Sequence, residues 1–129
     1  MTKNCKPFLK WAGGKTQLII EIEKSLPNEI LNKKFTYIEP FVGSGAILFW
    51  MINNFPNLEK AVINDINADL INTYKTIASK PKELISVLQQ FQNEYHQLDI
   101  EEEKKKEYYY LKRDLYNTRE TTKTTQAAL

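Results

Sequence analysis

The sequence contains few of the residues that cross-link a chain, bind a metal or anchor it in a membrane. It has one cysteine and one histidine among 129 residues. The single cysteine, Cys5, cannot form an internal disulfide, so we expect a cytoplasmic protein. The histidine, His96, has no second ligand-type residue at metal-binding spacing, which argues against a metal site. No apolar run approaches the roughly 20 residues that cross a bilayer, so we expect no membrane partner.

Glycine is also scarce, and the positions of the four glycines argue against two common nucleotide-binding loops. A dinucleotide-binding loop needs a third glycine three positions after Gly45, where Leu48 stands, so NAD is disfavoured. A phosphate-binding P-loop ending at Gly14 would need a glycine five positions earlier, where Leu9 stands. A nucleoside ligand without a pyrophosphate fits these glycines better.

The composition is that of a globular domain with little net charge. Hydrophobic residues make up 42% and charged residues 26% of the chain, a balance typical of soluble globular proteins. The length is sufficient for one small domain. The net charge of +2 and the pI of about 8.5 permit contact with nucleic acid but do not require it.

Residues 35–67 predict one βαβ unit, around which the rest of the chain is organised. A short apolar strand at 35–38 leads into a loop that contains two glycines. A helix is expected at 46–54 and a second strand at 61–63. This order of elements predicts the start of a doubly wound α/β domain.

Gly43, Gly45 and Asp65 are the candidate ligand-binding residues of this unit. Glycine has no Cβ, so it permits a sharp turn and a close approach of the backbone to a ligand. Asp65 follows the glycines by about 20 residues, the spacing at which a carboxylate can accept hydrogen bonds from ribose hydroxyls. The glycines alone are as consistent with a tight connection as with a binding loop. With Asp65 the pattern favours a nucleoside site.

Trp11 and Lys15 precede a helix that we expect at residues 16–25. An aromatic face and an ammonium group would suit a ligand that carries both a cation and a carboxylate. The alternative is a packed tryptophan and a solvated lysine. These residues in isolation favour the alternative.

Helices are expected throughout the second half of the chain. Asn67 predicts the N-cap of a helix at 68–78, apolar residues after Pro81 follow a helical period, and a further helix is expected from about Glu101 to Arg119. The last of these helices interleaves tyrosines with cations, a composition that suits nucleic acid. It also forms an ordinary apolar helix face, and this stretch alone favours packing over contact with DNA.

Three stretches together resemble the Dam-like, alpha-class DNA adenine-N6 methyltransferases. They are Phe-Leu-Lys-Trp-Ala-Gly-Gly-Lys at 8–15, Glu-Pro-Phe-Val-Gly-Ser-Gly at 39–45, and Asn-Asp-Ile-Asn at 64–67 with Asp69 and Leu70 after it. The resemblance implies a Rossmann-like S-adenosylmethionine-dependent methyltransferase fold, of which this chain has the first two strands. It places the N-terminal part of the cofactor-binding domain at residues 1–79. Residues 80–129 are then the start of a helical target-recognition domain.

The resemblance also implies ligands, partners and roles for particular residues. Trp11 and Lys15 would hold the methionine part of S-adenosylmethionine, Asp65 its ribose and Ile66 its adenine, while the loop from 39 to 45 wraps its centre. Double-stranded DNA is the implied partner, and a cognate restriction endonuclease is a candidate. The implied cofactor-binding residues are Trp11, Lys15, Glu39, Pro40, Phe41, Gly43, Gly45, Asp65 and Ile66. The candidate DNA-binding residues are Lys112, Arg113, Asn117 and Arg119.

The family's Asp-Pro-Pro-Tyr catalytic segment does not occur in this sequence, in which no two of the five prolines are adjacent. In the family this segment accepts hydrogen bonds from the adenine amine and stacks on the base after it is flipped out of the duplex. We therefore expect no catalytic residue here, and expect the chain to be the N-terminal portion of a longer methyltransferase, inactive alone. Two alternatives remain: a non-catalytic binding module, and a small-molecule nucleotide-binding protein.

Overall fold

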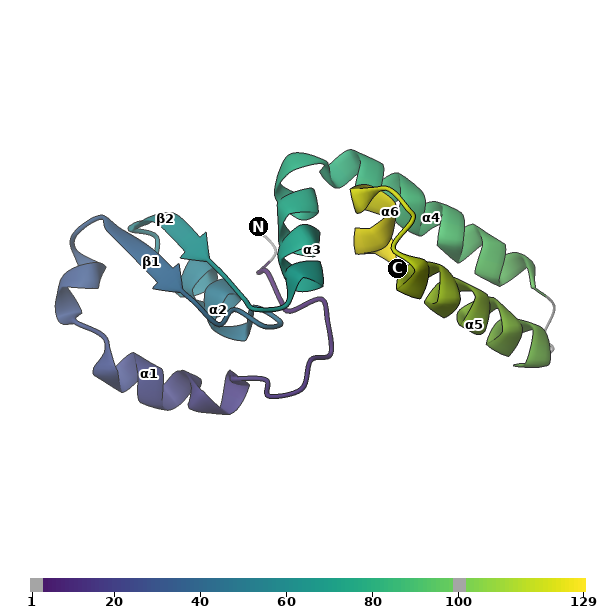
Figure 1. The fold of residues 1–129 in the computed structure, drawn as a ribbon. Helices are drawn as coiled ribbons and strands as arrows, with labels where there is room; N and C mark the ends of the chain where they lie inside the picture. The colour runs from purple at the N-terminus through teal and green to yellow at the C-terminus, as the bar shows by residue number, and fades with distance from the viewer. Residues whose placement is uncertain (1–3, 99–101) are drawn as a thin grey trace. The chain divides into compact units, whose positions relative to one another are not determined.

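The computed structural model describes residues 4–98 and 102–129, and it is a mixed α/β structure (Figure 1). Contacts divide the chain into two compact units between Ile66 and Asn67. The strands belong to the first unit, while the second contains helices alone among its described residues. Each unit is described by itself below.

The first unit contains a two-stranded parallel sheet and a helix between the strands. Its elements are a 3₁₀ turn at Thr16–Leu18, α1 at Ile19–Ser25, a second 3₁₀ turn at Asn28–Leu31, β1 at Phe35–Glu39, α2 at Ala46–Asn54 and β2 at Leu58–Ile63. In the parallel register Tyr37 lies beside Ala61, and Glu39 beside Ile63. The predicted βαβ unit is therefore confirmed, and the bounds of α2 agree with the predicted ones.

Three element boundaries in this unit differ from the prediction. β1 includes Glu39, one residue beyond the predicted strand. β2 begins three residues before the predicted strand, because Glu59 and Lys60 extend it with exposed charged side chains that hide the apolar pattern. The predicted helix at 16–25 opens with a 3₁₀ turn, and its α-helical part begins at Ile19.

The core of the first unit lies between α2 and the sheet. Ile47, Met51 and Phe55 are buried, and Met51 is the most buried of the three. Seven of the partly buried side chains that pack against them come from α1, the strands and the turn between them: Ile19, Ile22, Leu26, Ile30, Phe35, Tyr37 and Leu58. This packing fixes the ring of Tyr37 next to the loop that leaves β1.

The opposite face of the sheet carries exposed apolar side chains. Ile38 and Val62 are neighbours in the register, and they are 67% and 41% exposed. Parallel sheets are normally covered on both faces. Within the described part of the first unit, helix α2 packs on one face only (Figure 1).

The segment before α1 is attached to α2 by Asn53. Its amide oxygen accepts a hydrogen bond from the backbone N–H of Cys5 at 2.9 Å, and its amide nitrogen donates to the Cys5 carbonyl at 2.7 Å. The ring of Phe8 meets that of Phe49 edge-on, with centroids 6.2 Å apart. The start of the described chain is thus held against the helix that follows the glycine loop.

The second unit consists of α3 at Ala68–Ser79, α4 at Pro81–Gln97, α5 at Glu102–Thr118 and α6 at Lys123–Ala128. Asn67 caps α3 as predicted, because its side chain accepts from the backbone N–H groups of Asp69 and Leu70. Glu101, where the next helix was expected to begin, lies outside the described residues. Helix α6 contacts both α3 and α4, so α3 packs with the later helices. The functional boundary predicted at residue 79 stays a prediction.

Candidate functional site

The loop between β1 and α2 is fixed to the end of β2 by backbone and side-chain hydrogen bonds. The Gly43 N–H donates to Oδ2 of Asp65 at 3.0 Å, and the Val42 N–H donates to the carbonyl of Asn64 at 2.9 Å. Gly43 and Gly45 have φ values of +53° and +81°, in the region that other residues rarely adopt. The sequence correctly grouped the glycines with Asp65 at neighbouring strand ends.

A small pocket joins this loop to the segment that carries Trp11 and Lys15. The two stretches that line it are therefore adjacent in space, although about thirty residues separate them in the sequence. The residues that line the pocket are Trp11, Gly13, Gly14, Lys15, Val42, Gly43, Ser44 and Ala46.

Lys15 is held by two acceptors at the end of β1. Its Nζ lies 3.0 Å from Oε1 of Glu39 and also donates to the carbonyl of Phe41. Glu39 is only 6% exposed, and its Oε2 accepts a hydrogen bond from the Tyr37 hydroxyl at 2.7 Å. Lys15 is therefore neutralised by a buried partner and is not a freely solvated lysine.

The hydroxyl of Tyr37 remains a donor at all physiological pH values. Burial, followed by the hydrogen bond to Glu39 and the charge of that carboxylate, raises the pKa of Tyr37 well above its usual value. Tyr37 did not emerge from the sequence reasoning. The signal that could have found it is its position two residues before Glu39, since such residues share a face of a strand.

Apolar side chains near the loop and near Asp65 are exposed. Ile66 directly follows Asp65 and is 99% exposed, and Phe41 is also largely exposed. Pro40 is exposed, whereas Asp65 is half-buried. Exposed apolar side chains next to polar anchors are a frequent feature of ligand sites.

The four candidate DNA-binding residues of the second unit fall into two pairs. Lys112 and Arg119 are engaged within the unit. Lys112 lies 3.1 Å from Glu94 and its Nζ is 4.3 Å from the centroid of Phe91. Hydrogen bonds to Glu94 from Tyr108, Gln90 and Lys112, in order of effect, lower the pKa of Glu94 to about 2.

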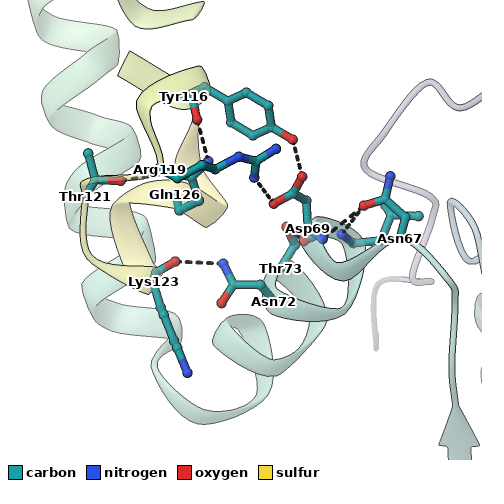
Figure 2. A network of polar contacts seen from close by, with 10 residues as sticks. Asn67, Asp69, Asn72, Thr73, Tyr116, Arg119, Thr121, Lys123 and Gln126 are labelled. Carbon is teal, nitrogen blue, oxygen red and sulfur yellow. Dashed lines mark hydrogen bonds and ion pairs between the residues drawn. The ribbon is translucent and has the colours of Figure 1, made fainter. Parts of the chain in front are cut away.

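Arg119 forms an ion pair with Asp69, which also accepts a hydrogen bond from the Tyr116 hydroxyl (Figure 2). These contacts lower the pKa of Asp69, the hydrogen bond from Arg119 having the larger effect. The same network includes a hydrogen bond from Asn72 to the carbonyl of Lys123 at 2.9 Å. Arg119 therefore joins the end of α5 to α3.

Arg113 and Asn117 lie on an exposed face of α5. Together with Lys106 and Tyr110 they are spaced by four, three and four residues, so they follow one side of the helix. We call Lys106, Tyr110, Arg113 and Asn117 the α5 stripe. The Arg113 guanidinium lies 4.6 Å from the centroid of the Tyr110 ring and also pairs with Asp114. Tyr110 belongs to the tyrosine-rich stretch that the sequence associated with nucleic acid, and the helical spacing adds Lys106 to the same side of the helix.

Neither a metal site nor a membrane span is found in the part of the chain that the structure describes. Residues 4–98 and 102–129 contain no cluster of three histidine, cysteine, aspartate or glutamate side chains that could hold a metal ion. Across the same ranges, no helix is both long enough and apolar enough to cross a membrane.

The fold and the pocket define a mixed α/β protein with a candidate ligand site at the carboxyl end of a parallel strand. Residues 11–129 match the D12 class N6 adenine-specific DNA methyltransferase family, and the chain belongs to this family. The family resemblance seen in the sequence is thereby confirmed.

Several relatives support the assignment. The type II methyltransferase M.MjaIII of Methanocaldococcus jannaschii is 46% identical over 113 residues, which are 87% of this chain and 38% of that protein. A DNA adenine methylase of Haemophilus influenzae is 49% identical over 72 residues, or 56% of this chain and 22% of the relative. A DNA adenine methylase of Salmonella typhi is 33% identical over 119 residues, which are 92% of this chain and 36% of that protein. The chain thus spans less than two fifths of the length of these relatives.

Proposed function

We propose that the protein transfers a methyl group from S-adenosylmethionine to N6 of adenine in double-stranded DNA. In this proposal residues 1–79 form the N-terminal part of a Rossmann-like cofactor-binding domain, and residues 80–129 begin a helical target-recognition domain. A cytoplasmic location and a cognate restriction endonuclease stay predictions. The family membership of residues 11–129 supports the reaction class.

The observation that carries the cofactor proposal is the hydrogen bond between the Gly43 N–H and Asp65 beside the pocket. It brings together a loop that a ligand can approach closely and a carboxylate that can accept from ribose hydroxyls. S-adenosylmethionine, when bound, supplies the methyl group. Its amino-acid end would lie at Trp11 and Lys15, its centre against residues 39–45, and its adenine against Ile66.

The donor and acceptor chemistry of these residues fits the cofactor. A lysine ammonium has three N–H donors. Among the residues that the structure describes, Lys15 gives donors to Glu39 and Phe41, so a third can bind a carboxylate of the ligand. The aromatic ring of Trp11 can attract a sulfonium cation. No catalytic residue is assigned within this sequence.

The α5 stripe is the surface that we propose for DNA. Cations there can contact phosphates, and tyrosine can stack on a base. Arg113 and Asn117 are the predicted DNA-binding residues that lie on this stripe. Lys112 and Arg119, in contrast, are proposed to support the helices through Glu94 and Asp69.

Calorimetric titration of the 129-residue chain with S-adenosylmethionine, ATP and NAD tests the cofactor proposal. We expect saturable binding of S-adenosylmethionine alone. Asp65→Asn retains an acceptor for Gly43 but removes the charge, and it should weaken binding about tenfold or more, because a hydrogen bond to a charged group contributes roughly 1.5–3 kcal/mol. Asp65→Ala should abolish binding.

Glu59→Ala is the matched control, because Glu59 is an exposed acidic residue on β2, the strand that Asp65 follows. The Glu59→Ala variant should bind S-adenosylmethionine with the affinity of the wild type. Unchanged affinity in Asp65→Ala would remove Asp65 from the site, and preference for ATP or NAD would replace the proposal with a nucleotide-binding function.

A second candidate function is a non-catalytic module that binds S-adenosylmethionine or DNA. The observation that favours it is that the pocket and the α5 stripe both lie within these 129 residues. The 129-residue chain alone is expected to transfer no methyl group under either proposal, so the source genome separates them: cofactor binding by this chain, with no Asp-Pro-Pro-Tyr segment encoded in frame after residue 129, would support this function.

A further inference from the structure

A continuous series of contacts leads from the hydrophobic core of the first unit to the pocket. The ring of Tyr37 packs against the cluster of Ile47, Met51 and Phe55. Its hydroxyl donates to Oε2 of Glu39 at 2.7 Å, and Oε1 of Glu39 lies 3.0 Å from Nζ of Lys15. Lys15 lines the pocket.

Both oxygens of the Glu39 carboxylate are therefore used, each by a different partner. A carboxylate held at one oxygen can still rotate about its last bonds, whereas one held at both oxygens has a single orientation. Lysine is a point charge on a flexible four-carbon stem, so its position depends on its anchors. The anchors of Lys15 are Glu39 and the Phe41 carbonyl.

We propose that Tyr37 is a positioning residue for the amino-acid end of the cofactor: it orients Glu39, and through Glu39 it places the ammonium of Lys15 in the pocket. This inference rests on the cofactor function proposed above. Tyr37 itself is not among the residues that line the pocket. Packing against the core holds the Tyr37 ring in place, so its hydroxyl donates to Glu39 from a fixed position.

Removing the hydroxyl should therefore affect one end of the ligand more than the other. In Tyr37→Phe the ring still fills the core, but the buried Oε2 of Glu39 loses its donor. Glu39 then rotates toward other donors, and Lys15 no longer has a fixed position. Contacts at Asp65 and Ile66, which serve the nucleoside end, are unchanged.

Two ligands separate these effects. S-adenosylhomocysteine and 5′-methylthioadenosine both carry an uncharged thioether sulfur on the same nucleoside, but only the first has an amino-acid end. In calorimetric titrations Tyr37→Phe should bind S-adenosylhomocysteine about tenfold more weakly than the wild type does, within the range of a hydrogen bond to a charged group. Its affinity for 5′-methylthioadenosine should change less than about twofold.

Tyr108→Phe is the matched control. The Tyr108 hydroxyl also donates to a glutamate, Glu94, at 2.7 Å, and that glutamate is also paired with a lysine, Lys112. This variant loses the same kind of hydrogen bond in the second unit and should bind both ligands as the wild type does.

A double-mutant cycle gives a second, independent readout. Lys15→Met should reduce the preference for S-adenosylhomocysteine over 5′-methylthioadenosine. If Tyr37 acts through Lys15, adding Tyr37→Phe to Lys15→Met should produce no further loss of preference, because the two effects are coupled. Additive losses would overturn the proposal.

The remaining outcomes are equally decisive. Equal weakening of both ligands in Tyr37→Phe would reduce Tyr37 to a structural role, and unchanged affinity for both would remove it from the site. A wild type that binds both ligands equally would show that Lys15 does not hold the amino-acid end, with the nucleoside site intact. A wild type that binds neither ligand would overturn the cofactor function itself.

Discussion

At the scale of single residues, Asp69 joins parts of the chain that are far apart in sequence. It binds Tyr116 and Arg119, which follow it by 47 and 50 residues. Arg119 directly follows α5 and has a φ of +61°, a conformation that is uncommon for a residue other than glycine. The ion pair with Asp69 stabilises this backbone turn, because it fixes the side chain of Arg119 against α3.

We predict that Asp69→Asn lowers the free energy of unfolding by about 1–2 kcal/mol, since charge-assisted hydrogen bonds are lost at a partly exposed site. The pKa of Asp69 is lowered in the folded protein, against about 3.9 for a free aspartate. The ionised Asp69 carboxylate therefore stabilises the folded protein fully above about pH 3.9, and this stabilisation is lost as the pH falls through the pKa of Asp69 in the folded protein.

Urea unfolding between pH 2 and pH 7 measures this contribution. The difference between the wild type and Asp69→Asn should be largest at neutral pH and should shrink in acid. Asp114→Asn, which alters an exposed aspartate, is the control for loss of charge alone. A constant difference across this range would contradict the assignment.

At the scale of elements, α5 has one face that packs against α4 and one face that is exposed and that we propose for DNA. Lys112 is 22% exposed and pairs with Glu94 on α4, whereas Arg113, one residue later, is 50% exposed and pairs with its neighbour Asp114 on α5 itself. Consecutive residues point about 100° apart on a helix. Lys112 therefore packs against α4, while Arg113 lies on the α5 stripe.

We predict that Arg113→Gln weakens binding of a short DNA duplex about fivefold, since one phosphate contact is lost. The slope of log affinity against log salt concentration should become less steep by about 1. Fluorescence anisotropy at several salt concentrations measures both quantities. Lys112→Gln should instead lower the unfolding midpoint and leave the salt dependence unchanged. The proposed division of α5 would be wrong if Lys112→Gln had the larger effect on DNA.

The comparison of sequence with structure is also clearest at this scale. The sequence located the strands, α2 and the cap at Asn67, because apolar periodicity and local capping chemistry decide them. It could not find the partners of Lys15 and Arg119. Those partners, Glu39 and Asp69, are brought near by tertiary packing over 24 and 50 residues, a separation that no local pattern encodes.

At the scale of the whole molecule, the chain combines a sheet-containing unit with a helical one. Two strands are few for a sheet, whose usual size is about four to six strands. The pair of Ile38 and Val62 leaves apolar surface on its open face. Exposed apolar surface of this kind favours association between molecules.

We predict that the double variant Ile38→Thr, Val62→Thr aggregates less than the wild type and unfolds within a few degrees of it, because threonine retains strand propensity and little burial is lost. Light scattering during storage and thermal unfolding measure the two effects. Ile47→Thr places the same hydroxyl in the core and should cost about 2 kcal/mol or more. Increased aggregation of the double variant would refute the role of this face.

The attachment of Cys5 to Asn53 has a kinetic consequence for the pocket. The segment that carries Trp11 is anchored at Cys5 by α2 and at Lys15 by Glu39. A segment anchored at both ends loses little conformational entropy when a ligand binds. In the cofactor site that we propose, Asn53, which does not line the pocket, would thereby keep Trp11 close to the position that it takes against the ligand, and would lengthen the residence time of the ligand.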